Sequence, residues 1–308
     1  MRVVFMGTPA FAVPSLRALL DAEFDVAAVC TQPDRPSGRG NRMTPCPVKA
    51  LAVERDVPVL QFERIRRQEG LDALFALAPD LLVTAAFGQI LSQRILDIPK
   101  HGTVNVHASL LPKYRGPAPI NWCIINGETM TGVTTMMTDA GIDTGDILMR
   151  RETEIGPDET AGELSQRLSV LGADLLLETL HRIGMGNCPR VPQDHMRATS
   201  HSILSKELGR VDWTQHAARI ENLVRGVNPW PGAYAEMTDG RTLKLWKARA
   251  VNGHGVPGST LCADAKRGLV IACGDGALAI TELQAPGARR MAASDYLLGH
   301  MPAFKEPS

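Results

Sequence analysis

The sequence predicts an α/β protein, in which a three-layer, Rossmann-like and mostly parallel sheet is followed by a smaller C-terminal β-barrel (OB-like) domain. In the first part of the chain, short runs of Val, Ala and Leu alternate with stretches of helical spacing. That alternation is typical of a parallel sheet covered by helices on both faces. The last part holds short strand-like runs between glycine-containing turns, which is typical of a small barrel.

Length and local composition locate the domain boundary. At 308 residues the chain exceeds one average domain. Residues 188–205, "CPRVPQDHMRATSHSILS", show neither helical nor strand periodicity. We therefore expect a first domain over residues 1–187, a linker over residues 188–205 and a second domain over residues 206–308.

Periodicity assigns the elements of the first domain in order. A helix is expected over residues 9–22, with Thr8 as its N-cap and Pro9 at its first position. A long amphipathic helix over residues 162–187 ends in glycines, which are a stop signal. Strands are expected wherever a short apolar run ends at a glycine or a polar residue: residues 2–7, 24–32, part of 80–91, and 103–109.

The second domain is expected to begin with a helix that the turn "NPWPG" closes. Its strands are expected in "GRTLKLWKARAV", "RGLVIAC" and "GALAITELQ", where apolar and polar residues alternate.

Parallel sheets bind ligands beyond the carboxyl ends of their strands. The residues that follow Gly7, Gly88 and His107 are therefore expected at one shared edge. The stretch "MGTPAF" has a single glycine before its helix rather than the GxGxxG pattern, so a dinucleotide site is not supported.

The strand "TVNVH" carries an unusual polar pair. Side chains alternate along a strand, so Asn105 and His107 share one face while Val104 and Val106 take the other. An amide and an imidazole N–H that converge on one point are what an oxyanion requires. The simpler alternative, a polar pair satisfied by neighbouring loops, stays open at this stage.

A third element is the loop "DAGIDTGDI", which contains Asp139, Asp143 and Asp146. A carboxylate beside an imidazole orients it or accepts a proton. Spacing does not choose among the three acids, and each of them is also suited to capping a turn. Because no Ser or Cys lies in a GxSxG context, the residues favour direct transfer to an incoming nucleophile over a covalent enzyme intermediate.

The overall charge is balanced, with 33 basic and 33 acidic residues. Basic residues nevertheless gather in a Gly/Pro-rich, non-periodic segment where Arg35, Arg39, Arg42 and Lys49 outnumber the single acid Asp34. We interpret this segment as a mobile loop that either contacts phosphate or is simply a solvated surface loop.

The six cysteines are scattered without metal-like spacing, so we expect reduced thiols and no metal site. No apolar run is long enough to cross a membrane, and the N-terminal run is broken too early for a signal peptide. These features predict a cytoplasmic protein that does not associate with membranes.

The motifs "NVHASLLPKYRGPAPI" and "GIDTGDI" resemble the signature of the 10-formyltetrahydrofolate-dependent formyltransferases. Within that family, "MGTPAF", "TQPDRPSGRG", "FGQIL" and "NPWPGAY" are similar to the enzymes that formylate methionyl-tRNA. The resemblance extends in order through both expected domains. It implies formyl transfer from 10-formyltetrahydrofolate, the formyl donor co-substrate, to the α-amine of methionyl initiator tRNA, in a monomeric enzyme without a metal.

The resemblance also implies roles for matching positions. Asn105 and His107 would polarise the formyl carbonyl, and Asp143 would orient His107 and help to take the amine proton. The second domain would present a basic surface to tRNA, and we expect the Leu111–Pro112 bond to be cis because the chain turns sharply there. The residues implied to bind folate are Phe87, Gly88, Gln89, Ile90, Ser109, Leu110, Leu111 and Pro112, and those implied to bind tRNA are Arg35, Arg39, Arg42, Lys244 and Lys247.

Two related activities compete with this interpretation. A formyltransferase acting on a small amine, such as a nucleotide sugar or glycinamide ribonucleotide, would share the NxH, SLLP and aspartate motifs but would not require the basic "DRPSGRGNR" loop. A formyltetrahydrofolate hydrolase would use water as its nucleophile. From a different class, a folate-binding module without activity is disfavoured, because Asn105, His107 and Asp143 are all intact.

Overall fold

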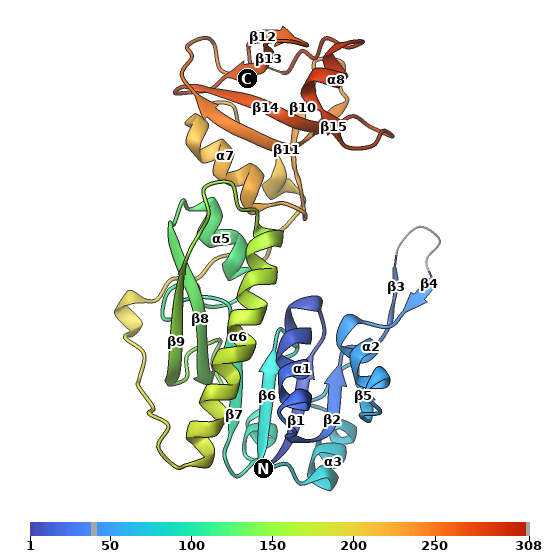
Figure 1. Ribbon diagram of the computed structural model, residues 1–308, viewed down its shortest axis with the longest axis vertical. Helices are drawn as coiled ribbons and strands as arrows, with labels where there is room; N and C mark the ends of the chain where they lie inside the picture. Colours follow the sequence, from blue (N-terminus) through green and yellow to red (C-terminus); the bar gives the residue numbers. More distant parts are fainter. Residues whose placement is uncertain (38–41, 306–308) are drawn as a thin grey trace. The chain divides into compact units, whose positions relative to one another are not determined.

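The computed structural model describes residues 1–37 and 42–305, with the side chains of residues 37 and 42 excepted (Figure 1). The described chain forms two compact units. Unit 1 comprises Met1–Gly116, Thr131–Glu154 and Ser165–Ser200, and unit 2 comprises Pro117–Met130, Ile155–Leu164 and the rest of the chain from His201.

Unit 1 is built on a seven-stranded sheet with the strand order β5-β2-β1-β6-β7-β8-β9. The pairs from β5 to β7 are parallel, and β8 runs antiparallel to β7. The predicted mostly parallel sheet is therefore confirmed. The strands are β1 (Arg2–Gly7), β2 (Asp25–Thr31), β5 (Val59–Gln61), β6 (Leu81–Ala85), β7 (Thr103–His107), β8 (Met130–Met137) and β9 (Ile147–Glu154).

Helices cover both faces of this sheet and make the three predicted layers. Helices α3 (Gln68–Leu77) and α4 (Gln93–Leu96) pack on the face that carries Val4 and Leu82. The opposite face carries Val106, and there α6 (Ala161–Gly184) comes so close that a Cβ at Gly172 would lie 2.8 Å from the Val106 side chain. The right-handed crossover rule assigns α1 (Val13–Asp21) and α2 (Pro47–Glu54) to this second face as well.

The predicted helix cap at Thr8 is wrong. The chain after β1 first makes a short 3₁₀ helix, Ala10–Ala12, whose N-cap is Pro9 and lacks a side-chain hydrogen bond. The Thr8 hydroxyl instead donates to the carbonyl of Phe87 (3.2 Å) and accepts from the backbone N–H of Gln32 (3.2 Å). Through these two hydrogen bonds Thr8 ties together the carboxyl ends of β1, β2 and β6.

In the described part of the basic segment after Gln32, two short strands replace the expected non-periodic loop. Strands β3 (Arg35–Ser37) and β4 (Arg42–Thr44) pair antiparallel as a short hairpin. The hairpin projects away from the sheet of unit 1 (Figure 1). Its base is held by Asp34, whose carboxylate accepts from Lys49 Nζ (2.6 Å) and Gln61 Nε2 (3.0 Å).

Unit 2 contains an antiparallel sheet with the strand order β10-β11-β14-β13-β12, and β15 pairs with β14. Its apolar core includes Ile220, Val224, Leu245 and Cys273. The small C-terminal β domain is therefore confirmed. Its elements are α5 (Pro119–Ile125), η3 (Glu207–Gly209), α7 (Ala217–Gly226), β10 (Ala233–Glu236), β11 (Thr242–Val251), β12 (Thr260–Asp264), β13 (Gly268–Ala272), β14 (Ala277–Gln284), β15 (Met291–Ala292) and α8 (Ala293–Leu297).

None of the six cysteines, all of which lie in the described part of the chain, forms a disulfide. Within the described residues, none of the helices combines the length and the apolar character that crossing a membrane demands.

Candidate active site

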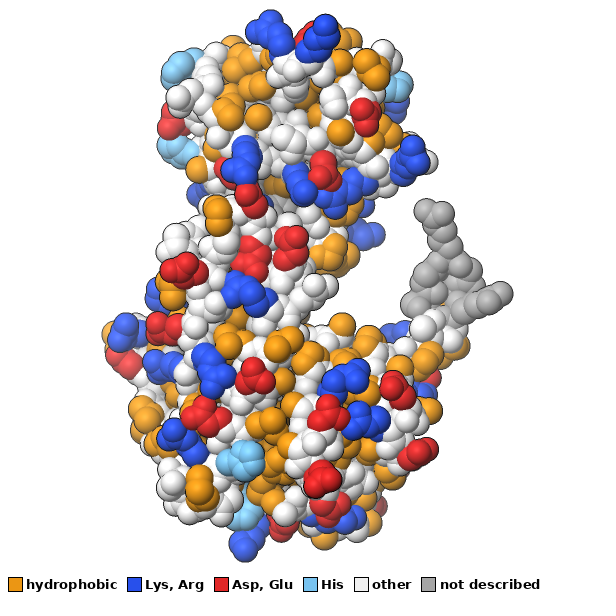
Figure 2. Space-filling model, viewed as in Figure 1, with side chains coloured by type: hydrophobic (Ala, Val, Ile, Leu, Met, Phe, Trp, Pro, Cys, Tyr) orange, Lys and Arg blue, Asp and Glu red, His pale blue; other side chains and the backbone are white. Residues whose placement is uncertain are grey.

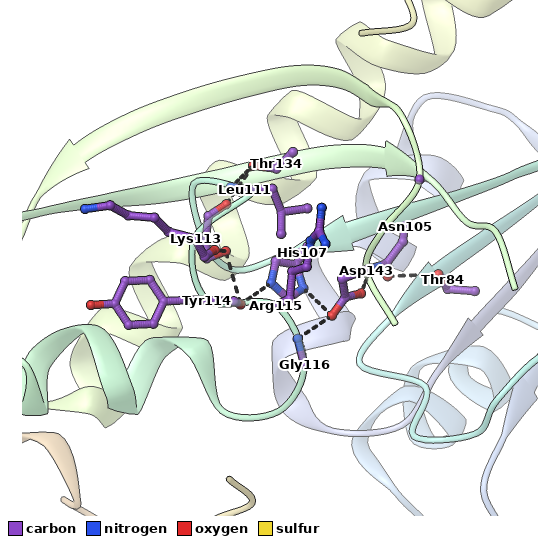
Figure 3. A network of polar contacts seen from close by, with 12 residues as sticks. Thr84, Asn105, His107, Leu111, Lys113, Tyr114, Arg115, Gly116, Thr134 and Asp143 are labelled. Carbon is purple, nitrogen blue, oxygen red and sulfur yellow. Dashed lines mark hydrogen bonds and ion pairs between the residues drawn. The ribbon is translucent and has the colours of Figure 1, made fainter. Parts of the chain in front are cut away.

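The polar pair on β7 lies on the face of the sheet opposite α6. Asn105 pairs with Thr84 across the β6–β7 ladder, and His107 lies beside Thr134 of β8. The imidazole is buried and the Asn105 side chain is half-buried. The alternation expected from the sequence is thus present, and it directs both side chains to one place at the carboxyl end of β7 (Figure 3).

Thr84 orients the amide of Asn105. Its hydroxyl donates a hydrogen bond to Asn105 Oδ1 at 2.9 Å. Because that bond engages the carbonyl end of the amide, the NH₂ end faces the other way, where Nδ2 lies 3.5 Å from Asp143 Oδ1. Asn105 is therefore held as a hydrogen-bond donor towards the carboxylate.

The backbone of Tyr114 selects the tautomer of His107. His107 Nε2 lies 2.9 Å from the Tyr114 carbonyl oxygen, which only accepts hydrogen bonds, so Nε2 carries the hydrogen. His107 Nδ1 lies 3.6 Å from Asp143 Oδ2. In the cationic form of the ring, Nδ1 also carries a hydrogen, and that hydrogen faces the carboxylate.

Of the three acids that spacing left open, Asp143, which the family resemblance implied, is the one that reaches His107. Its Oδ2 also accepts the backbone N–H of Gly116 at 2.8 Å. Asp139 is a turn cap, since its carboxylate accepts from Gly141 N and Thr144 Oγ1. The backbone carbonyl of Asp146 closes the loop by accepting from Met137 N.

The segment after β7 folds back over the sheet through local hydrogen bonds. Thr134 Oγ1 donates to the Ser109 carbonyl (2.6 Å) and accepts from Leu111 N (3.2 Å). The Leu111–Pro112 bond is cis, as predicted. Tyr114 has a left-handed backbone with φ of 59°, and this conformation aims its carbonyl at His107 while its phenol points away (Figure 3).

The residues expected to bind folate fall into two groups. Phe87, Ser109 and Leu111 are buried, and the Gln89 side chain is engaged with Ile65 N and the Phe62 carbonyl. Ile90, in contrast, is 67% exposed. Leu110 and Pro112 are half-buried, and Gly88 has a positive φ of 78°.

The residues expected to bind tRNA lie in both units. Arg35 is exposed on β3, Arg42 begins β4 with its side chain outside the described part, and Arg39 falls in the undescribed segment 38–41. On β11, Lys247 pairs with Glu282 at 3.0 Å, and Lys244 Nζ lies 5.7 Å from the Trp246 ring centroid. Figure 2 shows acidic side chains interspersed with the basic ones on the face displayed.

Sequence reasoning missed Thr84, Tyr114 and Gly116, which orient the polar pair and the carboxylate. Their contribution depends on a ladder partner and on backbone groups, which have no residue-type signal. Across residues 1–37 and 42–305, no three His, Cys, Asp or Glu side chains are grouped to hold a metal ion.

Comparison with known families identifies the class of protein. Residues 1–180 match the family model described as formyl transferase, and residues 203–301 match the model of the formyl transferase C-terminal domain. The chain therefore belongs to the formyl transferase family.

The relatives of this chain show which group within the family it resembles, and they confirm the resemblance to the enzymes that formylate methionyl-tRNA. Methionyl-tRNA formyltransferase of Geobacter sulfurreducens is 52% identical over 299 residues, with 97% of this chain and 94% of the relative covered. Methionyl-tRNA formyltransferase of Acetivibrio thermocellus is 49% identical over 302 residues, with 97% of both chains covered.

Solved structures share the fold at low identity. An N-formyltransferase from Helicobacter canadensis, in complex with folinic acid and dTDP-3-aminofucose, has a TM-score of 0.68 at 20% identity, with 91% of this chain and 99% of that chain covered. HypX from Aquifex aeolicus in complex with tetrahydrofolic acid has a TM-score of 0.62 at 20% identity. The match covers 96% of this chain but 47% of HypX.

Proposed function

We propose that this protein transfers the formyl group of 10-formyltetrahydrofolate to the α-amine of methionyl initiator tRNA, giving N-formylmethionyl-tRNA. The relatives that are about half identical over nearly the whole chain carry the name of this activity. The observation in the site that supports it most is the convergence of Asn105 Nδ2 and His107 Nδ1 on the Asp143 carboxylate.

Each of the three side chains has a distinct part in the proposed reaction. The α-amine attacks the formyl carbon, and negative charge develops on the formyl oxygen. The Asn105 N–H donates to that oxygen, and the Nδ1–H of cationic His107 is shared between that oxygen and Asp143. An oxyanion donor of this kind contributes about 3 kcal/mol to the transition state. Asp143 holds the imidazolium and accepts the amine proton. The bond from the formyl carbon to N10 then breaks, and N10 leaves with the proton that Asp143 accepted from the amine.

Water exclusion supports this assignment. The His107 side chain is only 7% exposed and that of Asp143 is 19% exposed. Hydrogen bonds and ion pairs are stronger in such a dry environment than in bulk water. The donors are also preorganised, because Thr84 and the Tyr114 carbonyl already hold them in their reactive orientation.

The folate co-substrate is proposed to bind along the two segments that flank the site. Ile90, Leu110 and Pro112 retain accessible apolar surface for a pterin ring, and the buried members of the set act by shaping the backbone. Gln32 helps to shape it, since its amide donates to the carbonyls of Phe87 (3.3 Å) and Gly88 (3.1 Å).

The tRNA is proposed to contact the β3–β4 hairpin through Arg35, Arg39 and Arg42, and unit 2 through Lys244 and Lys247. Backbone phosphates attract such side chains without reading sequence. Lys244 is exposed on β11, on the same side of the strand as the half-buried Trp246. A lysine and an aromatic ring presented together suit a phosphate and a base.

We further propose the domain roles and the state of the protein. Residues 1–187 are the catalytic domain, residues 188–205 the linker, and residues 206–308 the tRNA-binding β-barrel. The enzyme acts in the cytoplasm as a monomer without membrane contact, and sedimentation of the purified chain at working concentration tests its monomeric state.

One assay tests the proposed activity directly. The protein is incubated with 10-formyltetrahydrofolate and methionyl initiator tRNA, and the esterified amino acid is analysed for formylmethionine. In parallel reactions a dTDP-amino sugar replaces the tRNA as the acceptor, or the acceptor is left out so that water is the only nucleophile. Formyl transfer to the sugar, or release of formate without an amine, at a rate above that with the tRNA would contradict the proposal.

A further inference from the structure

We propose that Gln193 is a positioning residue for formyl transfer, which acts by clamping the two chain segments that hold the Asp143 carboxylate. This inference rests on the proposed function, because it presumes that Asp143 takes part in the reaction. Gln193 lies in the segment that the sequence pattern assigns to a linker, yet the residue is only 6% exposed.

The amide of Gln193 uses its full hydrogen-bonding capacity. Its Nε2 donates to the carbonyl of Asp143 at 2.8 Å and to the carbonyl of Gly145 at 2.7 Å. Its Oε1 accepts from Arg115 Nε at 3.0 Å and from Arg115 Nη2 at 2.7 Å. Two donors and two acceptor positions are what a side-chain amide offers, so this one is saturated.

These bonds join the two segments that define where the carboxylate lies. On one side, Gln193 holds the backbone of Asp143 itself. On the other side, it holds Arg115, which directly precedes Gly116, the residue whose N–H donates to Asp143 Oδ2 at 2.8 Å. The distance from Asp143 to His107 therefore depends on one buried amide that touches neither catalytic side chain.

The segment that contains Gln193 is itself hydrogen-bonded to Tyr114 and Arg115. The Arg115 N–H donates to the Thr199 carbonyl at 2.8 Å, and Arg115 Nη1 lies 3.2 Å from His195 Nδ1. Tyr114 N donates to Thr199 Oγ1 at 2.8 Å. Residues 193–199 consequently form a strap across the segment that also supplies the Tyr114 carbonyl to His107.

The loop around Asp143 needs such an external support. It contains Gly141 and Gly145, and glycine lowers the intrinsic stiffness of a loop. Asp143 itself has a left-handed backbone with φ of 52°, a conformation that persists only where the surroundings impose it. The two bonds from Gln193 hold the carbonyl of this strained residue and that of Gly145, two residues further along.

The test compares Gln193→Met with wild type in single-turnover formylation of methionyl initiator tRNA. Methionine has a similar length but makes none of the four hydrogen bonds. We expect the rate at saturating substrates to fall about 10- to 100-fold, as small displacements of catalytic groups do, while KM for both substrates stays at its wild-type value. Gln193→Asn is the second variant, since its amide is one methylene too short to reach both carbonyls.

A matched control separates positioning from general stability. Thr179 is a fully buried polar residue of unit 1 that bonds Thr135 Oγ1 (2.8 Å) and the Leu175 carbonyl (2.7 Å). Thr179→Val removes these buried bonds on the α6 face of the sheet, opposite the face that carries His107. We expect it to lower the Tm without lowering the single-turnover rate at a temperature where it is folded.

A double-mutant cycle shows whether Gln193 acts through Asp143. In an Asp143→Asn background, Gln193→Met is expected to change the residual rate less than about twofold, because residues that act through one another are not additive. The inference would be overturned if Gln193→Met lowered the single-turnover rate by the same factor in the wild-type and Asp143→Asn backgrounds. It would also be overturned if Gln193→Met and Gln193→Asn both kept the wild-type rate, or if Thr179→Val lowered the rate as much as Gln193→Met does. A wild-type rate for Asp143→Asn would instead remove the catalytic assignment of Asp143 on which the proposal depends.

Discussion

His107 Nε2 lies 2.9 Å from the carbonyl oxygen of Tyr114, and this single contact determines which imidazole nitrogen is available for chemistry. Because the carbonyl requires a hydrogen on Nε2, the lone pair of the neutral ring is on Nδ1, which faces Asp143. Tyr114 maintains this contact in a left-handed backbone conformation, which costs about 1–3 kcal/mol for a residue other than glycine. The fold thus stabilises a strained peptide in order to orient one ring.

Removing either oxyanion donor should slow the reaction strongly. We expect Asn105→Ala or His107→Ala to lower kcat by about two to three orders of magnitude, because each donor acts on charge that develops in the transition state. Steady-state formylation of methionyl initiator tRNA measures this effect.

The chain offers a matched control for the His107 variant. His216 forms a comparable pair with Asp275 at 3.1 Å, but its side chain is 74% exposed. His216→Ala should keep the wild-type kcat. Wild-type turnover by Asn105→Ala and His107→Ala would contradict the oxyanion assignment.

Thr84 is expected to control the orientation of Asn105. Thr84→Val keeps the shape of the side chain but removes the donor to Asn105 Oδ1, so the amide is free to turn over. We expect kcat to fall about tenfold with a loss of roughly 1 kcal/mol in stability, which is the usual contribution of one hydrogen bond. Thr84→Ser restores the hydroxyl and should recover most of kcat. If the Val and Ser variants have the same kcat, the hydroxyl has no orienting role.

The Asp143 loop should not tolerate a side chain at Gly145. A Cβ there would lie 1.9 Å from the Met137 carbonyl oxygen, which is backbone and cannot turn aside. Gly145→Ala is therefore expected to lower both the Tm and kcat, because the loop must move away from His107. A Cβ at Gly184, at the end of α6, would have no atom within 4 Å among the described residues, apart from its chain neighbours and the nearby backbone of its own helix.

Gly184→Ala is the matched control for that substitution. It should leave kcat unchanged and stabilise the protein by up to about 1 kcal/mol, because alanine favours the helix. An active Gly145→Ala variant with a wild-type Tm would contradict the close contact.

The stability that Asp34 contributes at the base of the β3–β4 hairpin should depend on pH. Hydrogen bonds from Lys49 and Gln61 lower the pKa of Asp34 below its ordinary value of 3.8. A carboxyl group whose pKa is lower in the folded state stabilises the fold above its unfolded pKa, and this contribution is lost as the pH falls through the folded pKa. The Tm difference between wild type and Asp34→Asn should therefore be larger at about pH 6 than at about pH 3. A difference that is independent of pH would rule out this ionic contribution.

Arg35 should contribute to tRNA binding through charge. We expect Arg35→Ala to raise KM for the tRNA, with KM for folate unchanged, and to reduce the slope of log affinity against log salt by about one. Arg94→Ala, which removes an exposed charge on α4, is the control. A loss that does not depend on ionic strength would argue against a phosphate contact.

Local sequence patterns were sufficient to predict the architecture of the fold. The period of two along "TVNVH" assigned Asn105 and His107 to one face, and the alternation of apolar runs with helical stretches indicated the parallel sheet. These predictions hold because backbone geometry itself sets side-chain periodicity and the side of each crossover. Thr8 shows where local rules fail, since its hydroxyl bonds to Phe87, 79 residues away, instead of capping the next helix.

The sequence by itself determined the fold class, the polar pair of β7 and the family that its motifs resemble. Residue spacing could not choose among Asp139, Asp143 and Asp146, which lie in one glycine-flanked loop, and only the tertiary structure shows that Asp143, the acid implied by the resemblance, approaches His107. The tertiary structure also brought Gln193 to Asp143 from 50 residues away. The physical reason is that hydrogen bonds between distant segments depend on how loops pack against each other, and residue types and spacing carry no information about that packing.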